Sequence, residues 1–146
     1  MNPFNSVLLL IYALTLTASA EDILKPLQGT WKSDKEATHK ELRTISLWTA
    51  EQIKEIERFV GRVTLSFAGT TMHLKYPNQE YKGEPHVTTL KDGRTKVEYT
   101  DSKFGKEVIV IELDRDGMWV TWPQRALHIR ERLIRQSERA ESGRRE

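Results

Sequence analysis

From Val63 onward the chain alternates apolar and polar residues with a period of two, and this pattern restricts the fold to antiparallel β-structure. Large apolar residues recur at every second position over 63–67, and the alternation resumes over 72–76. Asp92-Gly93 and Asp116-Gly117 are strong signals for tight hairpin turns. Short strands separated by turns at intervals of roughly 8–12 residues are typical of a β-sandwich or a β-barrel.

The other strand candidates complete a closed sheet. The segment 81–90 is interrupted by Gly83 and Pro85, which indicates a bulge or an edge, and 108–111 is continuously apolar, as in a strand covered on both faces. Counting the stretch around Trp31 as the first strand, we predict a mainly β fold, an eight-stranded antiparallel up-and-down barrel. Pairing the first strand with the last removes both exposed edges, and such a barrel has room for side chains or one small ligand.

Two helical patterns lie between the first and second strands. Ser33 and Thr49 each stand three residues before a Glu or a Gln, which is the spacing of a capping box. We expect the first helix over about 34–43 and the end of the second at Gly61, because glycine accepts the left-handed conformation that stops a helix. The predicted barrel therefore carries a two-helix insertion. The second helix has an apolar stripe formed by Ile53, Ile56, Phe59 and Val60.

The first twenty residues differ from the rest of the chain. They carry no charge, they are apolar over 7–16, and they end in Ala18-Ser19-Ala20, the small-x-small pattern that signal peptidase accepts. We predict a signal peptide at 1–20, a cut after Ala20, a periplasmic or secreted protein, and no stable membrane anchor after cleavage. The alternative is a retained anchor, although the apolar run is only about half of the roughly 20 residues that span a bilayer. The absence of cysteine excludes disulfides and suits a bacterial periplasm.

The remaining composition argues against several classes of function. A net charge of +2 without a clustered basic face predicts no nucleic-acid partner. The four histidines lack metal-ligand spacing, and no cofactor motif is present, so we predict neither a metal nor a cofactor. No nucleophile motif or carboxylate pair indicates an enzyme, which would need a cleft with a perturbed acid or base. We place the folded domain at 21–135 and a disordered polar tail at 136–146.

Gly29-Thr30-Trp31 resembles the Gly-x-Trp that opens the first strand of the calycins, the group of the lipocalins and the intracellular fatty-acid-binding proteins. In these families the Trp closes one end of the barrel and packs near an Arg of the last strand. The resemblance implies that Gly29, Trp31 and Arg132 close the barrel, with Arg130 as the other candidate arginine. The helix pair is similar to the lid of the fatty-acid-binding proteins. Those proteins have more strands and no export signal, whereas lipocalins lack the helix pair.

The end of the chain is also similar to the terminal strand of the fatty-acid-binding proteins, which holds a carboxylate with an Arg-x-Tyr. On that register His128 takes the Arg position and Arg130 the Tyr position. Leu127, Ile129 and Leu133, however, alternate with these polar residues. If the apolar face points inward, the anion site lies outside the barrel.

The aromatic residues predict either the wall of a ligand cavity or a barrel filled with rings. Trp119 and Trp122 point to opposite faces of one strand, so one of them is expected outside. We predict an exported lipocalin-like protein that binds a small hydrophobic ligand under the helices. The alternative is a ligand-free envelope interaction or inhibitor module whose protein partner is unknown. The candidate ligand-binding residues are Phe67, Tyr76, Tyr99, Trp119, His128 and Arg130.

Overall fold

The structure is a computed structural model that describes residues 17–45, 47–77, 79–123 and 129–137. Its helical elements are α1 (Ala20–Leu24), the 3-10 turn η1 (Lys25–Leu27), α2 (Lys35–Arg43) and α3 (Ala50–Ile56). Its strands are β1 (Gly29–Ser33), β2 (Thr64–Ala68), β3 (Thr71–Tyr76), β4 (Gln79–Gly83), β5 (His86–Thr89), β6 (Thr95–Asp101), β7 (Gly105–Leu113), β8 (Met118–Thr121) and β9 (Arg130–Arg135).

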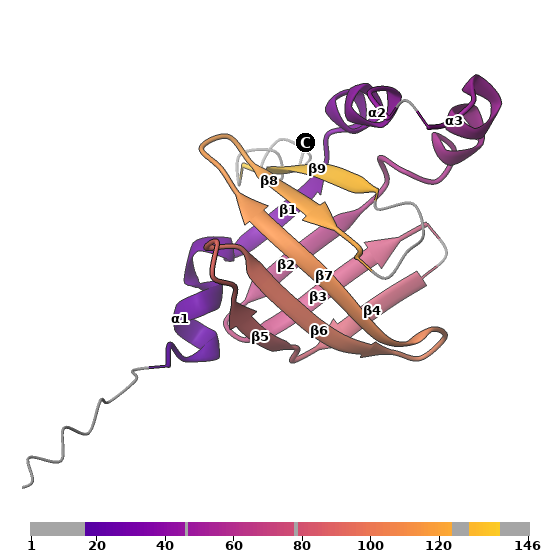
Figure 1. The fold of residues 1–146 in the computed structure, drawn as a ribbon. Coiled ribbons are helices and arrows are strands. Elements are labelled where there is room, and N and C mark those ends of the chain that lie inside the picture. The colour runs from indigo at the N-terminus through magenta and orange to yellow at the C-terminus, as the bar shows by residue number, and fades with distance from the viewer. Residues whose placement is uncertain (1–16, 46, 78, 124–128, 138–146) are drawn as a thin grey trace, which may run out of the picture.

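Within these residues nine strands form one antiparallel sheet that is strongly curled into a half-barrel (Figure 1). The order is β4-β3-β2-β1-β9-β8-β7-β6-β5, so each pair except β1–β9 joins neighbours along the chain. Trp31 on β1 lies opposite Arg135 on β9, which confirms the predicted pairing of the first strand with the last. The mainly β, up-and-down architecture is confirmed, but the barrel is not the closed eight-stranded one that the sequence predicts.

The extra strand arises where we expected a single interrupted one. Glu84 and Pro85 separate β4 from β5, and these two strands form the edges of the sheet. Proline has no backbone N–H to donate and a fixed φ, so it does not continue a hydrogen-bonded ladder. The sheet therefore opens at the point where the sequence carries its strand breakers.

The concave face of the sheet holds the hydrophobic core. Alternate residues of each strand point inward, as period-two segments must when one face is buried. Leu24 of α1 and Leu27 of η1 join these side chains at one end of the barrel, where α1 packs beside β5 (Figure 1). The N-terminal helical segment therefore plugs that end.

The helix insertion lies where it was predicted, between β1 and β2, with two corrections. The first is that α3 ends at Ile56, with Glu57 as its C-cap, and not at Gly61; turns occupy the residues between them. The second is that the side chain of Asp34, not Ser33, caps α2 by accepting a hydrogen bond from Ala37 N. Thr49 and Gln52 form the predicted capping box of α3. Ser33 remains in β1 and bonds elsewhere, as described below.

The predicted leader and tail lie mostly outside the described residues. Ser19 caps α1, so the expected cut after Ala20 falls in the first turn of a helix that belongs to the folded body. At the other end, Gln136 N donates to Thr30 O over 2.8 Å. Among the described helices, none has the length and apolar character required to cross a membrane.

Candidate functional site

The candidate ligand-binding residues divide between the two faces of the sheet. Phe67, Tyr76 and Tyr99 point into the core, as predicted. Trp119 and Arg130 lie on the outer face, where the Arg130 guanidinium carbon is 4.5 Å from the centroid of the Trp119 ring. His128 lies outside the described residues. The tryptophan that enters the core is Trp122, which directly follows β8 and is only 3% exposed, so Trp119 and Trp122 do take opposite faces.

The end of the interior near α1 is filled by side chains. Leu65, Met72 and Leu74 have no accessible surface, and Phe67 beside them is 2% exposed. A side chain that lined a water-sized void would keep some accessible surface, so this region is packed as tightly as an ordinary core. Phe67 is therefore a packing residue in this structure.

The opposite end of the interior is built from aromatic rings. Tyr76 and Trp122 have ring centroids 5.7 Å apart, and Tyr81 and Tyr99 have centroids 4.7 Å apart, both at tilted angles that favour ring contact. Tyr76 and Tyr81 are only half-buried, unlike the aliphatic core. Burial nevertheless raises the pKa of the Tyr81 hydroxyl. We call these four residues the aromatic wall.

Two buried carboxylates lie on the same inward face near the aromatic wall. Asp101 ends β6 and accepts hydrogen bonds from Lys103 N (2.7 Å) and Phe104 N (2.9 Å), which shapes the turn into β7. Glu107 on β7 lies directly opposite Tyr99 in the β6–β7 register. Asp101 is 2% exposed and Glu107 is 8% exposed, so both are buried. This end of the interior thus combines aromatic surface with acidic groups, in contrast to the aliphatic end.

Trp31 packs against an arginine of the last strand, as the resemblance implies, but this arginine is Arg135 and not Arg132. The guanidinium carbon of Arg135 is 4.3 Å from the Trp31 ring centroid, and Arg135 donates to Pro26 O (3.1 Å) and Gln28 O (2.5 Å). The Trp31 Nε1–H donates to Leu27 O over 2.8 Å, which ties the strand to the plug. Gly29 has φ +105°, and a Cβ there would lie 3.3 Å from Arg135 Nη1. The role expected for Arg132 is therefore held by Arg135.

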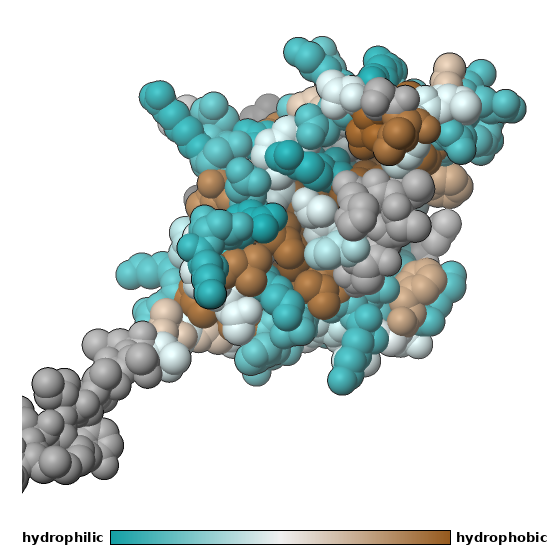
Figure 2. Space-filling view, in the orientation of Figure 1, coloured by the Kyte–Doolittle hydropathy of each residue, from teal (hydrophilic) through white to brown (hydrophobic). Residues whose placement is uncertain are grey.

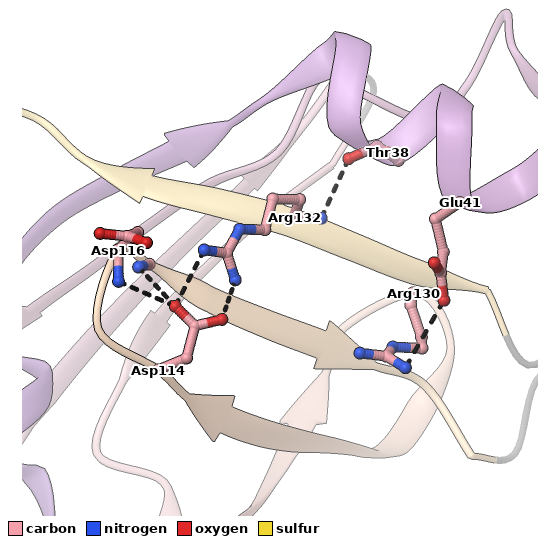
Figure 3. A network of polar contacts seen from close by, with 7 residues as sticks. Thr38, Glu41, Asp114, Asp116, Arg130 and Arg132 are labelled. Carbon is pink, nitrogen blue, oxygen red and sulfur yellow. Dashed lines mark hydrogen bonds and ion pairs between the residues drawn. The ribbon is translucent and has the colours of Figure 1, made fainter.

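Arg132 and Arg130 instead belong to a network on the outer face, under α2 (Figure 3). Arg132 binds both carboxylate oxygens of Asp114, and its backbone N donates to Thr38 Oγ1 over 2.9 Å. Arg130 Nη1 lies 3.5 Å from Glu41 Oε1. The hydrogen bonds from Arg132 lower the pKa of the Asp114 carboxyl to about 2. These contacts attach α2 to the sheet, and they remove both arginines from the interior where an anion anchor was sought.

Glu131 was missed by the sequence analysis. It points inward from β9 and is 3% exposed. Its carboxylate accepts hydrogen bonds from Gly61 N (3.0 and 3.1 Å) and from the Ser33 hydroxyl (3.0 Å). Burial raises the pKa of this carboxyl, although the bonds from Gly61, Ser33 and Thr38 act in the opposite direction. The available signal was its position, two residues before Leu133 on the apolar side of the strand.

Two surface hollows in the described part of the chain are lined by residues other than the aromatic wall. One, of about 440 Å³, lies along α3. The other, of about 560 Å³, lies beside η1 at the plugged end. The first is lined by Trp48, Thr49, Glu51, Gln52, Glu55 and Ile56, and the second by Pro26, Leu27, Asp92, Gly93, Arg94, Thr95, Ile111, Glu112 and Leu113.

No family model, curated protein or solved structure matches this chain. The curled antiparallel sheet is compatible with a calycin-like barrel, and that compatibility rests on the fold alone. Among the described residues, His, Asp and Glu side chains form no group of three or more that could hold a metal ion.

Proposed function

We propose that this protein is an exported, calycin-like carrier that binds a small hydrophobic ligand against the aromatic wall. The supporting observation is the difference in packing along the interior. Side chains fill the plugged end, whereas Tyr76 and Tyr81 stay half-buried at the other end. Concave aromatic surface with a few polar groups is the usual composition of a small-molecule site.

Binding requires no covalent step. A ligand that buries about 300 Å² of apolar area gains roughly 7 kcal/mol before the cost of association is subtracted. Asp101 and Glu107 add polar groups at the same end, and they disfavour ligands with an uncompensated negative charge there. The preferred ligand is therefore apolar and not strongly anionic.

The carrier proposal includes export through the leader at 1–20. Cleavage after Ala20 removes the Ser19 cap of α1, which costs the helix about 1 kcal/mol. Leu24 and Leu27 lie after the cut and keep the plug in place. Intact mass spectrometry of the protein exported by a bacterial host tests this step: a mass that begins at Glu21 supports it, and a mass that retains the leader contradicts it.

Binding is tested by titrating the purified domain with two fluorescent probes, anilinonaphthalene sulfonate, which is anionic, and the uncharged N-phenyl-1-naphthylamine. We expect saturable binding of the uncharged probe and weaker binding of the sulfonate. Trp122→Phe should lower the affinity for the uncharged probe by about twofold to tenfold, which is the range for loss of one aromatic contact. Trp119→Phe is the matched control, since it makes the same change three residues earlier, within β8 and on the outer face.

Two results contradict the carrier proposal. One is the absence of saturable binding for both probes in a folded domain. The other is an equal loss of affinity in the Trp119 and Trp122 variants, because that result places the probe elsewhere.

The second candidate is the interaction module, which is favoured by the surface of the helical insertion. Leu47 is 89% exposed and Phe59 is 67% exposed, and the described residues of α3 include none that is fully buried. Figure 2 shows apolar surface gathered over the hairpin of α2 and α3. Co-purification of a protein partner that is lost in a Leu47→Asp/Phe59→Asp variant, but kept in the control Leu113→Asp, supports this alternative.

A further inference from the structure

One carboxylate holds both ends of the helical insertion. The insertion leaves the sheet after Ser33 and returns to it at Thr64, three residues after Gly61. The Ser33 hydroxyl donates to a carboxylate oxygen of Glu131 over 3.0 Å, and the Gly61 N–H donates to the other oxygen over 3.0 Å. The Thr38 hydroxyl of α2 also interacts with this carboxyl. Helix, strand and returning chain thus meet at a single titratable group.

No ion pair of the described residues joins a cation to this carboxylate. Within the described ranges, Glu131 takes part in no ion pair, because Arg132 pairs with Asp114 and Arg130 with Glu41. The aliphatic part of Lys35 packs over Gly61, where an added Cβ would lie 2.8 Å from Lys35 Cγ. The charged and titratable residues on the elements that meet here are Lys32 of β1, Asp34, Lys35, Glu36, His39, Lys40, Glu41 and Arg43 of α2 and its cap, Arg62 before β2, and Arg130, Arg132 and Arg135 of β9; β8 contributes none.

The surroundings accept the carboxyl in either protonation state. As an anion it receives the bonds from Gly61 and Ser33. With a proton it can donate to Ser33 Oγ, whose own hydrogen can turn to Val63 O, 3.3 Å away. Gly61 still donates to the other oxygen. Protonation therefore keeps one bond to Ser33 and one to Gly61, and it removes the cost of a buried, unpaired charge.

We propose that Glu131 is a proton-controlled clasp: with its proton it fastens both ends of the helical insertion to the sheet, and as an anion it makes this junction the first to open. The direction follows from linkage. Opening hydrates the carboxyl and returns it toward its ordinary acidity, so the closed state binds the proton more strongly than the open state. Low pH favours the closed insertion, and rising pH favours opening.

Hydrogen exchange of the backbone amides in α2 tests the clasp, after correction for the intrinsic pH dependence of exchange. From pH 4.5 upward, the opening constant of α2 should rise relative to the amides of β6 and β7 and then level off. The rise is about tenfold for each unit by which burial raises the Glu131 pKa. In Glu131→Gln, a neutral side chain of the same size, the opening constant should be small and independent of pH.

Glu36→Gln is the matched control, because it makes the same chemical change on the exposed side of α2. It should keep the pH dependence of the parent. The Gly61 amide proton provides a second measurement in the unaltered protein, since its chemical shift must follow the titration of its acceptor Glu131 with a midpoint above 4.5.

The clasp is overturned if α2 opens independently of pH, if opening decreases as pH rises, or if Glu131→Gln keeps the parent's pH dependence. If Glu131→Gln does not fold, the Gly61 titration decides alone, and a midpoint at or below 4.5 rejects the proposal. None of these measurements uses a ligand. The carrier proposal can therefore fail while the clasp proposal stands, and the clasp proposal can fail while the carrier proposal stands.

Discussion

The two ends of the sheet interior are formed by the same strands but contain different chemistry. The plugged end holds Leu24, Leu27 and aliphatic partners without accessible surface. The other end holds tyrosines, Trp122 and buried carboxylates. Buried acids lower stability unless they are well bonded, so an end built only for stability has no need of them. The comparison distinguishes an end packed only with apolar side chains from an end that also buries polar groups, where we propose that the ligand binds.

The largest effect on stability should come from the plugged end. Leu24→Ala removes a fully buried side chain from α1 and should lower the free energy of unfolding by about 3 kcal/mol, measured by urea denaturation. Leu47→Ala, at an 89% exposed position, should change it by less than about 0.5 kcal/mol. Similar losses in the two variants would mean that α1 does not plug the barrel.

The contacts that tie the plug to the sheet should matter next. Arg135→Ala removes two hydrogen bonds to the carbonyls of Pro26 and Gln28 and the stack on Trp31, and should cost about 1–2 kcal/mol. Arg130→Ala on the same strand removes one 3.5 Å ion pair and an outer stack on Trp119, and should cost about 0.5 kcal/mol. Thermal melts of both variants sharpen the comparison, and a reversed order would contradict the conclusion that Arg135 ties the plug to the sheet.

Changes in the aromatic wall should affect stability less. Tyr81→Phe keeps the ring against Tyr99 and deletes only a hydroxyl, so the free energy of unfolding should stay within about 0.5 kcal/mol of the parent. The same urea titration measures it. A loss as large as that of Leu24→Ala would remove the distinction between the two ends.

The smallest effect concerns Asp114, whose carboxyl has a pKa of about 2 because Arg132 binds it. A depressed pKa contributes stability above the ordinary value of 3.8, and that contribution disappears as the pH falls toward 2. Because the side chain is 43% exposed, solvent screening limits the contribution to about 0.3 kcal/mol. Asp114→Asn should remove this part of the acid sensitivity in melts between pH 4 and pH 2, and an unchanged profile would contradict it.

Local patterns predicted much of the fold. The period of two gave β2 and β3, the Thr49–Gln52 spacing gave the cap of α3, and the Gly-x-Trp placed Trp31 beside the last strand. These features depend on residues that lie near each other in sequence or on one distinctive motif. Their physical causes are therefore present in a short window of the chain.

The parts that failed depend on long-range pairing. Which face of β9 points inward is set by its partners, and a shift of one residue moves every side chain to the other face. That register put Arg130 and Arg132 outside, brought Arg135 to Trp31 and buried Glu131. The edge at 81–90 was predicted as one of two alternatives, a bulge or an edge, but the division into two strands was not, because a Gly and a Pro mark an interruption without fixing its extent.

The β1–β9 pairing has a consequence for the speed of folding. Each half of the sheet, β1–β4 and β5–β9, can assemble largely by pairing strands that are adjacent along the chain. The exception is the pair β1–β2, because the helical insertion separates these two strands in the sequence. Joining Trp31 to Arg135 requires all of the chain between these two residues to form one loop, and such closures are entropically slow. We expect the β1–β9 pairing to form last, so that the half-barrel acquires its curvature only in the final step of the folding reaction.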